Sequence, residues 1–283
     1  MNTLKTLLFL TVLTVLLIIV GGLLGGRNGM IVALVFAAIM NFVSYWFSDK
    51  IVIGIFRGRR IEEKDNPRLF SIIRRVSQGA QIPMPKVYLI PSESPNAFAT
   101  GRNPKHAAVA VTQGILEILN EDELEGVISH EAAHIKNRDI LTQTIVATLA
   151  GAISMLAYMA RFTALFGGYG GRDNNRSGGG LGLLIMAIIA PILALLIQMA
   201  ISRSREFAAD ETGAKLSHKP LYLASALEKL HNATRRVPLQ ANPATAHIFI
   251  VSPLSSQSFA SLFSTHPPVQ KRIEKLYDLA KKT

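Results

Sequence analysis

The chain has 283 residues, no cysteine, a mean hydropathy of +0.30 and only 17% charged residues. The high apolar content excludes an intrinsically disordered protein, and the absence of cysteine excludes a disulfide scaffold or a cysteine-based metal site. Lysine and arginine outnumber aspartate and glutamate by 30 to 19, a net charge of +11. A positive excess of this size fits either nucleic acid or a membrane surface as a partner.

Four uncharged segments decide between these partners. They have lengths of 21, 21, 21 and 26 residues and comprise residues 6–26, 28–48, 140–160 and 177–202. A helix of 21 residues reaches roughly 31 Å, the thickness of the hydrocarbon core of a bilayer. We therefore expect an integral membrane protein with about four transmembrane helices. The first segment is expected to stay as an anchor, because no cleavage site of a signal peptide closes it.

The loops between the segments predict an orientation. Residues 1–48 are expected to form a transmembrane hairpin, and residues 140–202, with the glycine-rich loop 167–180, a second one that could instead be buried partly against protein. Basic residues follow the first hairpin, namely Lys50, Arg57, Arg59 and Arg60. The positive-inside rule then places both termini and the polar segments 49–139 and 203–283 in the cytoplasm.

The positive charge needs no nucleic acid to explain it. Residues 49–139 carry 13 basic and 12 acidic side chains, whereas residues 203–283 carry 12 basic and 6 acidic ones. The excess thus belongs to the second polar segment and to the membrane edges, where anionic headgroups attract it. We expect the lipid bilayer as a partner and no nucleic acid.

A helix that carries candidate catalytic residues is predicted to begin after Asn120. Asn120 can cap this helix, and Glu123 completes a capping box. It contains the segment His130-Glu131-Ala132-Ala133-His134. Histidines at i and i+4 lie on one face and can bind one metal ion, while Glu131 projects toward the open coordination position. This is the HExxH arrangement of zinc peptidases. The alternative is a helix whose two histidines merely face a polar groove.

A catalytic zinc needs a third protein ligand and an open position. Other histidines are available, but Glu206 is better placed, and Asp210, one turn later, could orient an imidazole. On spacing alone, a surface helix with ordinary acids explains this pair equally well. Two hydrophobic segments separate His134 from Glu206, and two crossings would return the chain to the same side of the membrane.

These motifs resemble the HtpX family of membrane zinc endopeptidases, relatives of the CAAX prenyl endopeptidases. The resemblance runs almost end to end, and it is carried by residues 95–101, 107–112, 130–134, 137–139, 204–210, 265–268 and 272–273. It implies His130, His134 and Glu206 as ligands of one Zn²⁺ per chain and Glu131 as the catalytic base. It also implies a stress-related quality-control protease of the cell inner membrane that cleaves misfolded or damaged membrane proteins on the cytoplasmic side.

The expected fold is a mainly α membrane protein with a zincin-like catalytic domain and a small mixed sheet against the HExxH helix. In the expected reaction, Glu131 takes a proton from the attacking water and passes it to the leaving amine. His266 lies in a Thr-His-Pro-Pro turn and is a candidate oxyanion donor or a reversible gate on the metal. The alternative is a histidine in a surface turn. Arg272 is a weaker candidate for the same neighbourhood.

Substrate is expected to bind by strand addition. Residues 86–90 and 107–112 are predicted strands, and an exposed edge there would pair with an extended peptide of almost any sequence. The residues assigned to this substrate strand are Asn96, Ala97, Phe98, Ala99, Thr100, Val109 and Val111. For residues 96–100, a plain structural loop is the alternative. The expected substrates are membrane proteins or unfolded polypeptides, and the sequence leaves the oligomeric state open.

Three other functions compete with this interpretation. An intramembrane protease would place the HExxH helix inside the bilayer, where each central charge costs about 2.5–3.5 kcal/mol, and charges crowd both ends of this helix. A metal transporter would need ionisable residues inside its spans, and the four uncharged segments have none. A membrane chaperone or scaffold that retains a peptidase fold is the main alternative, although the intact Glu131 argues against it.

Overall fold

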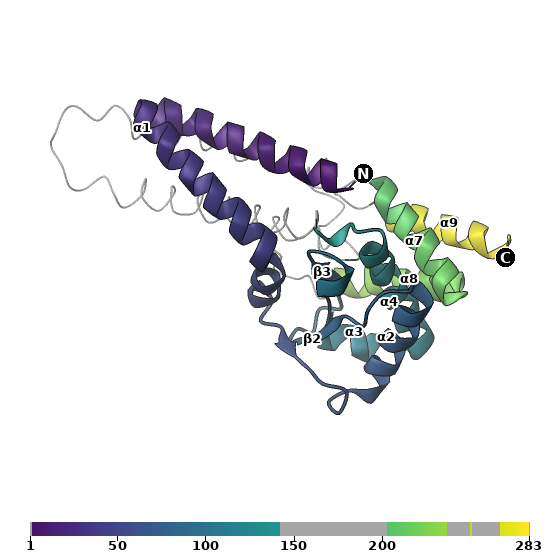
Figure 1. Cartoon of the computed structure of the whole chain (residues 1–283). Coiled ribbons are helices and arrows are strands. Elements are labelled where there is room, and N and C mark those ends of the chain that lie inside the picture. The colour runs from purple at the N-terminus through teal and green to yellow at the C-terminus, as the bar shows by residue number, and fades with distance from the viewer. Residues whose placement is uncertain (1, 142–202, 237–249, 251–266, 283) are drawn as a thin grey trace.

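The computed structural model describes residues 2–141, 203–236, 250 and 267–282 (Figure 1). The described part is mainly helical with one small mixed sheet, as the sequence predicted. In chain order its elements are α1 (Asn2–Ile55), β1 (Arg59–Arg60), α2 (Pro67–Ala80), β2 (Lys86–Ile90), β3 (Ala97–Gly101), the 3-10 helix η1 (Pro104–His106), β4 (Ala107–Thr112), α3 (Gln113–Ile118), α4 (Glu121–Lys136), α7 (Arg203–Ser217), α8 (Pro220–Arg236) and α9 (Val269–Ala280).

Helix α1 consists of two arms that meet at a corner, the two purple and blue rods of Figure 1. The chain reverses at Gly26, whose φ of 57° lies in the left-handed region that glycine adopts without a steric cost. Across the arms, the Asn41 side-chain amide donates a hydrogen bond of 2.9 Å to the Thr14 hydroxyl. The two arms contain the predicted segments 6–26 and 28–48, and the second arm continues to Ile55.

Within the described residues, one stretch is long and apolar enough to cross a membrane, the 22 residues Gly26–Phe47. Its large apolar side chains point outward, with Val32 69% exposed and Phe42 59% exposed. Contact with lipid explains such an outward apolar face better than contact with water. The predicted second hairpin, with the segments 140–160 and 177–202 and the loop 167–180, lies outside the described residues except for its first two residues.

The sheet has the strand order β1-β2-β4-β3, in which β2 and β4 are parallel and the two outer pairs are antiparallel. Strands β2 and β4 have the predicted limits. The prediction of an exposed edge at residues 107–112 is wrong, because β4 is paired on both sides, and Val109 and Val111 are buried. The edge strand on that side is β3, whose five residues are buried as well.

Helix α4 lies at the centre of the helical layer, and its residues 123–135 are all buried. It packs against α2, α7, α8 and β3. The predicted capping box is present, since the Glu123 amide donates to the Asn120 side chain at 2.9 Å and the Asn120 amide donates to the Glu123 carboxylate at 3.0 Å. Central packing and a defined start fix the direction in which α4 presents its histidines.

A small apolar cluster joins the end of α1 to the sheet. Val52 and Ile53 of α1 pack against Ile90 of β2, Phe98 of β3 and Ala110 of β4. The second arm of α1, which contains the apolar stretch Gly26–Phe47, is therefore attached to the sheet that lies beside α4.

Candidate metal and catalytic site

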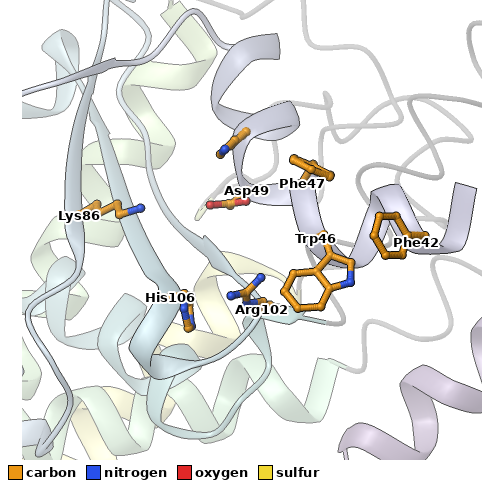
Figure 2. A pocket seen from close by; sticks show the side chains of 8 residues that line it. Phe42, Trp46, Phe47, Asp49, Lys86, Arg102 and His106 are labelled. Atoms are coloured by element: carbon orange, nitrogen blue, oxygen red, sulfur yellow. The ribbon is translucent and has the colours of Figure 1, made fainter. Parts of the chain in front are cut away.

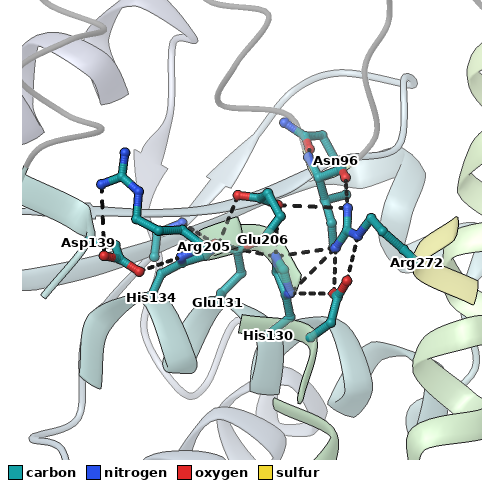
Figure 3. A network of polar contacts seen from close by, with 11 residues as sticks. Asn96, His130, Glu131, His134, Asp139, Arg205, Glu206 and Arg272 are labelled. Carbon is teal, nitrogen blue, oxygen red and sulfur yellow. Dashed lines mark hydrogen bonds and ion pairs between the residues drawn. The ribbon is translucent and has the colours of Figure 1, made fainter. Parts of the chain in front are cut away.

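Helices α4 and α7 bring the three predicted metal ligands together (Figure 3). The Nε2 atoms of His130 and His134 lie 3.2 Å apart. The Glu206 carboxylate reaches both rings, with Oε2 at 3.7 Å from His130 Nε2 and Oε1 at 3.5 Å from His134 Nε2. All three side chains are buried. Segments more than 70 residues apart in the sequence thus form one cluster.

Gly213 explains how α7 comes close enough to α4. A Cβ at this position would lie 2.8 Å from the backbone nitrogen of His130, so a hydrogen is all that fits there. Glu206, Asp210 and Gly213 are spaced i, i+4 and i+7 and therefore share one face of α7. The close contact at Gly213 holds that face, and the two acids on it, against the histidines.

Two carboxylates orient the imidazole rings. His130 donates from Nδ1 to Asp210 at 2.9 Å, and the position of Asp210 one helix turn after Glu206 had suggested this contact. His134 donates from Nδ1 to Asp139 at 3.4 Å. A ring that donates from Nδ1 keeps the lone pair of Nε2 available for a metal. The two carboxylates therefore direct both Nε2 atoms toward the same point.

Asp139 is a site residue to which the sequence interpretation gave no role. Helix α4 ends in a left-handed turn at Arg138, with a φ of 58°. The amide of Asp139 donates to the carbonyl of His134 at 2.9 Å, and the amide of Arg138 donates to that of Ile135 at 3.1 Å, which is the Schellman pattern. This turn folds Asp139 back onto the ring of His134. The position of this carboxylate just past the end of the helix that carries both histidines could have indicated it as a partner of His134.

Arg272 of α9 is fully buried and holds Asp210 with a two-pronged ion pair. Its Nε and Nη2 lie 2.8 and 2.7 Å from the two oxygens of Asp210, and its Nη1 donates to the carbonyl of Ile250 at 2.7 Å. Arg272, predicted from the sequence to lie in the neighbourhood of the metal together with Asp210, therefore positions Asp210. His266, the candidate oxyanion donor, lies outside the described residues.

Glu131 faces the edge strand rather than another carboxylate. One of its oxygens accepts a hydrogen bond of 2.7 Å from the backbone amide of Ala99 in β3. Thr112 donates to the carbonyl of Asn96 across the β3–β4 ladder, so by alternation the main-chain groups of Ala97 and Ala99 point away from β4. The proton-transfer residue and the open side of the edge strand are thus adjacent.

Burial and charge shift the pKa values at this site. Burial raises the pKa of Glu131, against the opposing charges of the two histidines. Burial alone would lower the pKa of His134, but its hydrogen bond to Asp139 and the nearby carboxylates raise it to about 9. Burial also disfavours the charged form of Asp210, yet Arg272 outweighs it and holds the pKa of Asp210 below its usual value. Glu131 is the group placed to exchange protons.

The cluster has the chemistry of a catalytic zinc site. Two imidazole nitrogens and one carboxylate oxygen, all within 4.8 Å of one another, match the ligand set that holds zinc in peptidases. The outer carboxylates on both rings complete the environment that such ligands need. The residues present therefore fit a zinc ion.

The model of peptidase family M48 matches residues 63–280. The chain belongs to this family. It is 56% identical to a protease HtpX homolog of Thermococcus sibiricus, over 98% of this chain and 96% of that protein. It is 55% identical to the protease HtpX homolog of Thermodesulfovibrio yellowstonii over 100% of both chains. The resemblance stated from the motifs is thus confirmed.

The crystal structure of S. mikatae Ste24p has a similar fold, with a TM-score of 0.54 at 16% sequence identity. The similarity covers 98% of this chain and 63% of that one. The M48 match and the HtpX relatives make this chain a membrane metalloprotease, as the sequence predicted. A non-catalytic chaperone or scaffold is not favoured.

Proposed function

We propose that this chain is a zinc-dependent endopeptidase of the cell inner membrane that hydrolyses misfolded or damaged membrane proteins. The observation that supports this most is the buried cluster of His130, His134 and Glu206 beside Glu131. In this proposal the chain crosses the membrane several times, with both termini and the catalytic segments on the cytoplasmic side.

A zinc ion held by the cluster would supply a Lewis acid that polarises a carbonyl and makes water more acidic. Glu131 accepts the proton of the attacking water and delivers it to the leaving amine. Its raised pKa suits this double role, because a group that both takes and gives a proton works best near the operating pH. The amide of Ala99 orients its carboxylate, and Asp210 and Asp139 keep the histidines in the ligand tautomer.

Substrate would bind along β3 by main-chain hydrogen bonds. The outward main-chain groups of Ala97 and the outward carbonyl of Ala99, whose amide is bonded to Glu131, can pair with an extended peptide, and this pairing does not depend on the side chains of that peptide. Asn96 supports the start of the strand through hydrogen bonds with Thr112 and the amide of Ile250. Because the residues of β3 are buried, strand addition requires that this edge be uncovered. Unfolded segments of damaged proteins are the extended chains that such an edge accepts.

Metal analysis and a protease assay test the proposal together. Wild type, Glu131→Gln and Glu206→Ala are purified in detergent, and their zinc content and hydrolysis of unfolded casein are measured. We expect one zinc per chain in wild type and Glu131→Gln, with activity lowered about 10²–10⁴-fold in the latter. The exposed Glu228 supplies a matched control, since Glu228→Gln is expected to resemble wild type. Full activity in Glu131→Gln would refute the mechanism, and full zinc in Glu206→Ala would remove the third ligand.

The absence of cysteine makes the orientation testable by single-cysteine labelling. A membrane-impermeant thiol reagent is applied to intact cells that carry Lys64→Cys or Asn28→Cys, with opened cells as the control. We expect Asn28→Cys, at the corner of α1, to be labelled in intact cells, and Lys64→Cys to be labelled only in opened cells. The reverse pattern would overturn the proposed orientation.

A further inference from the structure

A second cavity lies apart from the metal cluster, where α1 meets the end of the sheet (Figure 2). Its volume is about 510 Å³, within the range of roughly 300–1,000 Å³ that small-molecule sites occupy. One wall is aromatic and comes from α1, and the facing wall is basic and comes from the sheet.

Sheet topology assembles the basic wall. Lys86 is the first residue of β2, Arg102 directly follows β3, and His106 directly precedes β4. Strands β2 and β4 are parallel and β3 is antiparallel to β4, so these three positions lie at the same end of the sheet. The apolar cluster of Val52 and Ile53 holds α1 against the sheet toward the other end of its strands, and the contact of Arg102 with Trp46 joins this end to α1.

The aromatic wall lies at the end of the membrane-crossing stretch. Phe42, Trp46 and Phe47 line the cavity, and the stretch ends at Phe47. These rings are 42–59% exposed, as expected of an aromatic belt at the headgroup level of a bilayer. The cavity thus sits at the depth of lipid headgroups, with an apolar side that faces the acyl chains.

Cations are held over these rings. The guanidinium carbon of Arg102 lies 4.3 Å from the centre of the Trp46 ring, and Lys50 Nζ lies 5.5 Å from that of Phe47. Such contacts place the charges without neutralising them. With the three cations Lys50, Lys86 and Arg102 and the one acid Asp49, the lining of the cavity has a net charge of +2 when His106 is neutral.

Several basic side chains elsewhere in the domain form ion pairs with carboxylates. Arg75, Lys219 and Lys229 each lie within 3.3 Å of a carboxylate. Within the described part of the chain, Lys50, Lys86 and Arg102 form no ion pair with a carboxylate. An unneutralised basic cavity at headgroup depth calls for an anion with an apolar tail.

We propose that this cavity binds the phosphate headgroup of an anionic phospholipid taken from the surrounding bilayer. The planar guanidinium of Arg102 and the ammonium groups of Lys50 and Lys86 contact the phosphate, and the acyl chains lie along Phe42 and Trp46. The bound lipid holds the end of the sheet at which β3 finishes, next to Arg102, against the membrane surface. The edge strand beside Glu131 is then kept at a fixed height above the bilayer.

The chain's single tryptophan reports directly on this cavity, because it is Trp46. Bromine on an acyl chain quenches tryptophan fluorescence on close contact. The full chain is placed in lipid nanodiscs with rising fractions of brominated phosphatidylglycerol or brominated phosphatidylcholine. We expect half-quenching at a clearly lower fraction of the brominated phosphatidylglycerol. Equal fractions for the two lipids would overturn the proposal.

Two variants make the test specific. Lys86→Gln and Arg102→Gln are each expected to weaken the preference for phosphatidylglycerol about fivefold, the effect of one basic residue near a charged surface. Lys64→Gln is the control, since this exposed lysine lies outside the cavity, and it should leave the preference intact. Zinc content verifies that each variant is folded. An unchanged preference in the Lys86→Gln, Arg102→Gln double variant would overturn the proposal.

Two further arms use only the wild type. A salt titration should reduce the preference, because screening weakens charge pairing at the surface, and a preference that persists unchanged in 1 M salt contradicts the proposal. Free glycerol 1-phosphate at millimolar concentration should not compete. If it abolishes the preference, the cavity takes a soluble phosphate ester and the lipid is excluded as its ligand.

Discussion

Replacing Arg272 with methionine should destabilise the catalytic domain more than any change to its surface charges. Arg272 is 0% exposed and its partner Asp210 is 3% exposed, so neither charge is hydrated in the folded protein. Among the described residues, these contacts of 2.7 and 2.8 Å and that with His130 compensate the buried carboxylate. Removing one member of a buried pair costs about 3–5 kcal/mol, because the other charge is left uncompensated. For a domain of this size, that corresponds to roughly 6–20 °C in the unfolding temperature.

Thermal unfolding in detergent, followed by circular dichroism at one fixed scan rate, measures this effect. The matched control is Arg74→Met, which breaks an ion pair with Glu63 in which both side chains are at least half exposed, and it should leave the unfolding temperature nearly unchanged. Combining Arg272→Met with Asp210→Leu should recover most of the lost stability, because the buried carboxylate that Arg272 holds at 2.7–2.8 Å is then removed with it, and the pairing of Arg272 with Glu206 that is also lost is weaker, at 3.9 Å. Zinc affinity should stay low in that double variant, since His130 has lost the carboxylate that orients it. A fall of less than about 2 °C in Arg272→Met would refute the argument from burial.

Three further predictions follow from the same contacts. Gly213→Ala should lower the free energy of unfolding by about 1–3 kcal/mol and weaken zinc binding, because the new methyl group meets the backbone of α4. Gly54→Ala, where the new methyl group meets open space, should change neither, and unfolding and metal titration measure both variants. Burial acts to raise the pKa of Glu123, but hydrogen bonds, above all from Lys229, lower it overall. The stability advantage of wild type over Glu123→Gln should therefore be fully present above the pKa of an unfolded glutamate, about 4.3, and be lost as the pH falls through the lower pKa of the folded state, measured by unfolding across acidic pH. Because the pKa of metal-free His134 is about 9, zinc uptake at pH 7 should release a proton, and zinc affinity should rise with pH toward 9. Calorimetry in buffers of different ionisation enthalpy counts the released proton. If no proton is released, the proposed effect of the ion pairs on the pKa of His134 is wrong.

Local patterns in the sequence predicted what depends on neighbouring residues. The capping box at Asn120 and the i, i+4 spacing of His130 and His134 follow from helix geometry alone, and both are present. Strands β2 and β4 have the predicted limits because their apolar runs end in turn residues. Strand β3 was not predicted as the edge, since the short segment between them is not a long apolar run, and its pairing partner, β4, is set by the fold.

Sequence motifs spread along the chain were enough to identify the family. Composition and the period of a single helix were enough to find a stretch in the first hairpin that is long and apolar enough to cross a membrane, and a pair of histidines on one helix face. Only the tertiary structure decided how Glu206 approaches that pair, since the approach depends on the absence of a side chain at Gly213, where two distant helices touch. The same holds for Asp139 and Arg272, whose roles arise from a helix-ending turn and from a buried ion pair with a helix far along the chain. Contacts between remote segments carry no periodic trace in the sequence. For that reason the ligands and Asp210, one helix turn from Glu206, could be named in advance, while the contact of Asp139 with His134 and the ion pair of Arg272 with Asp210 could not.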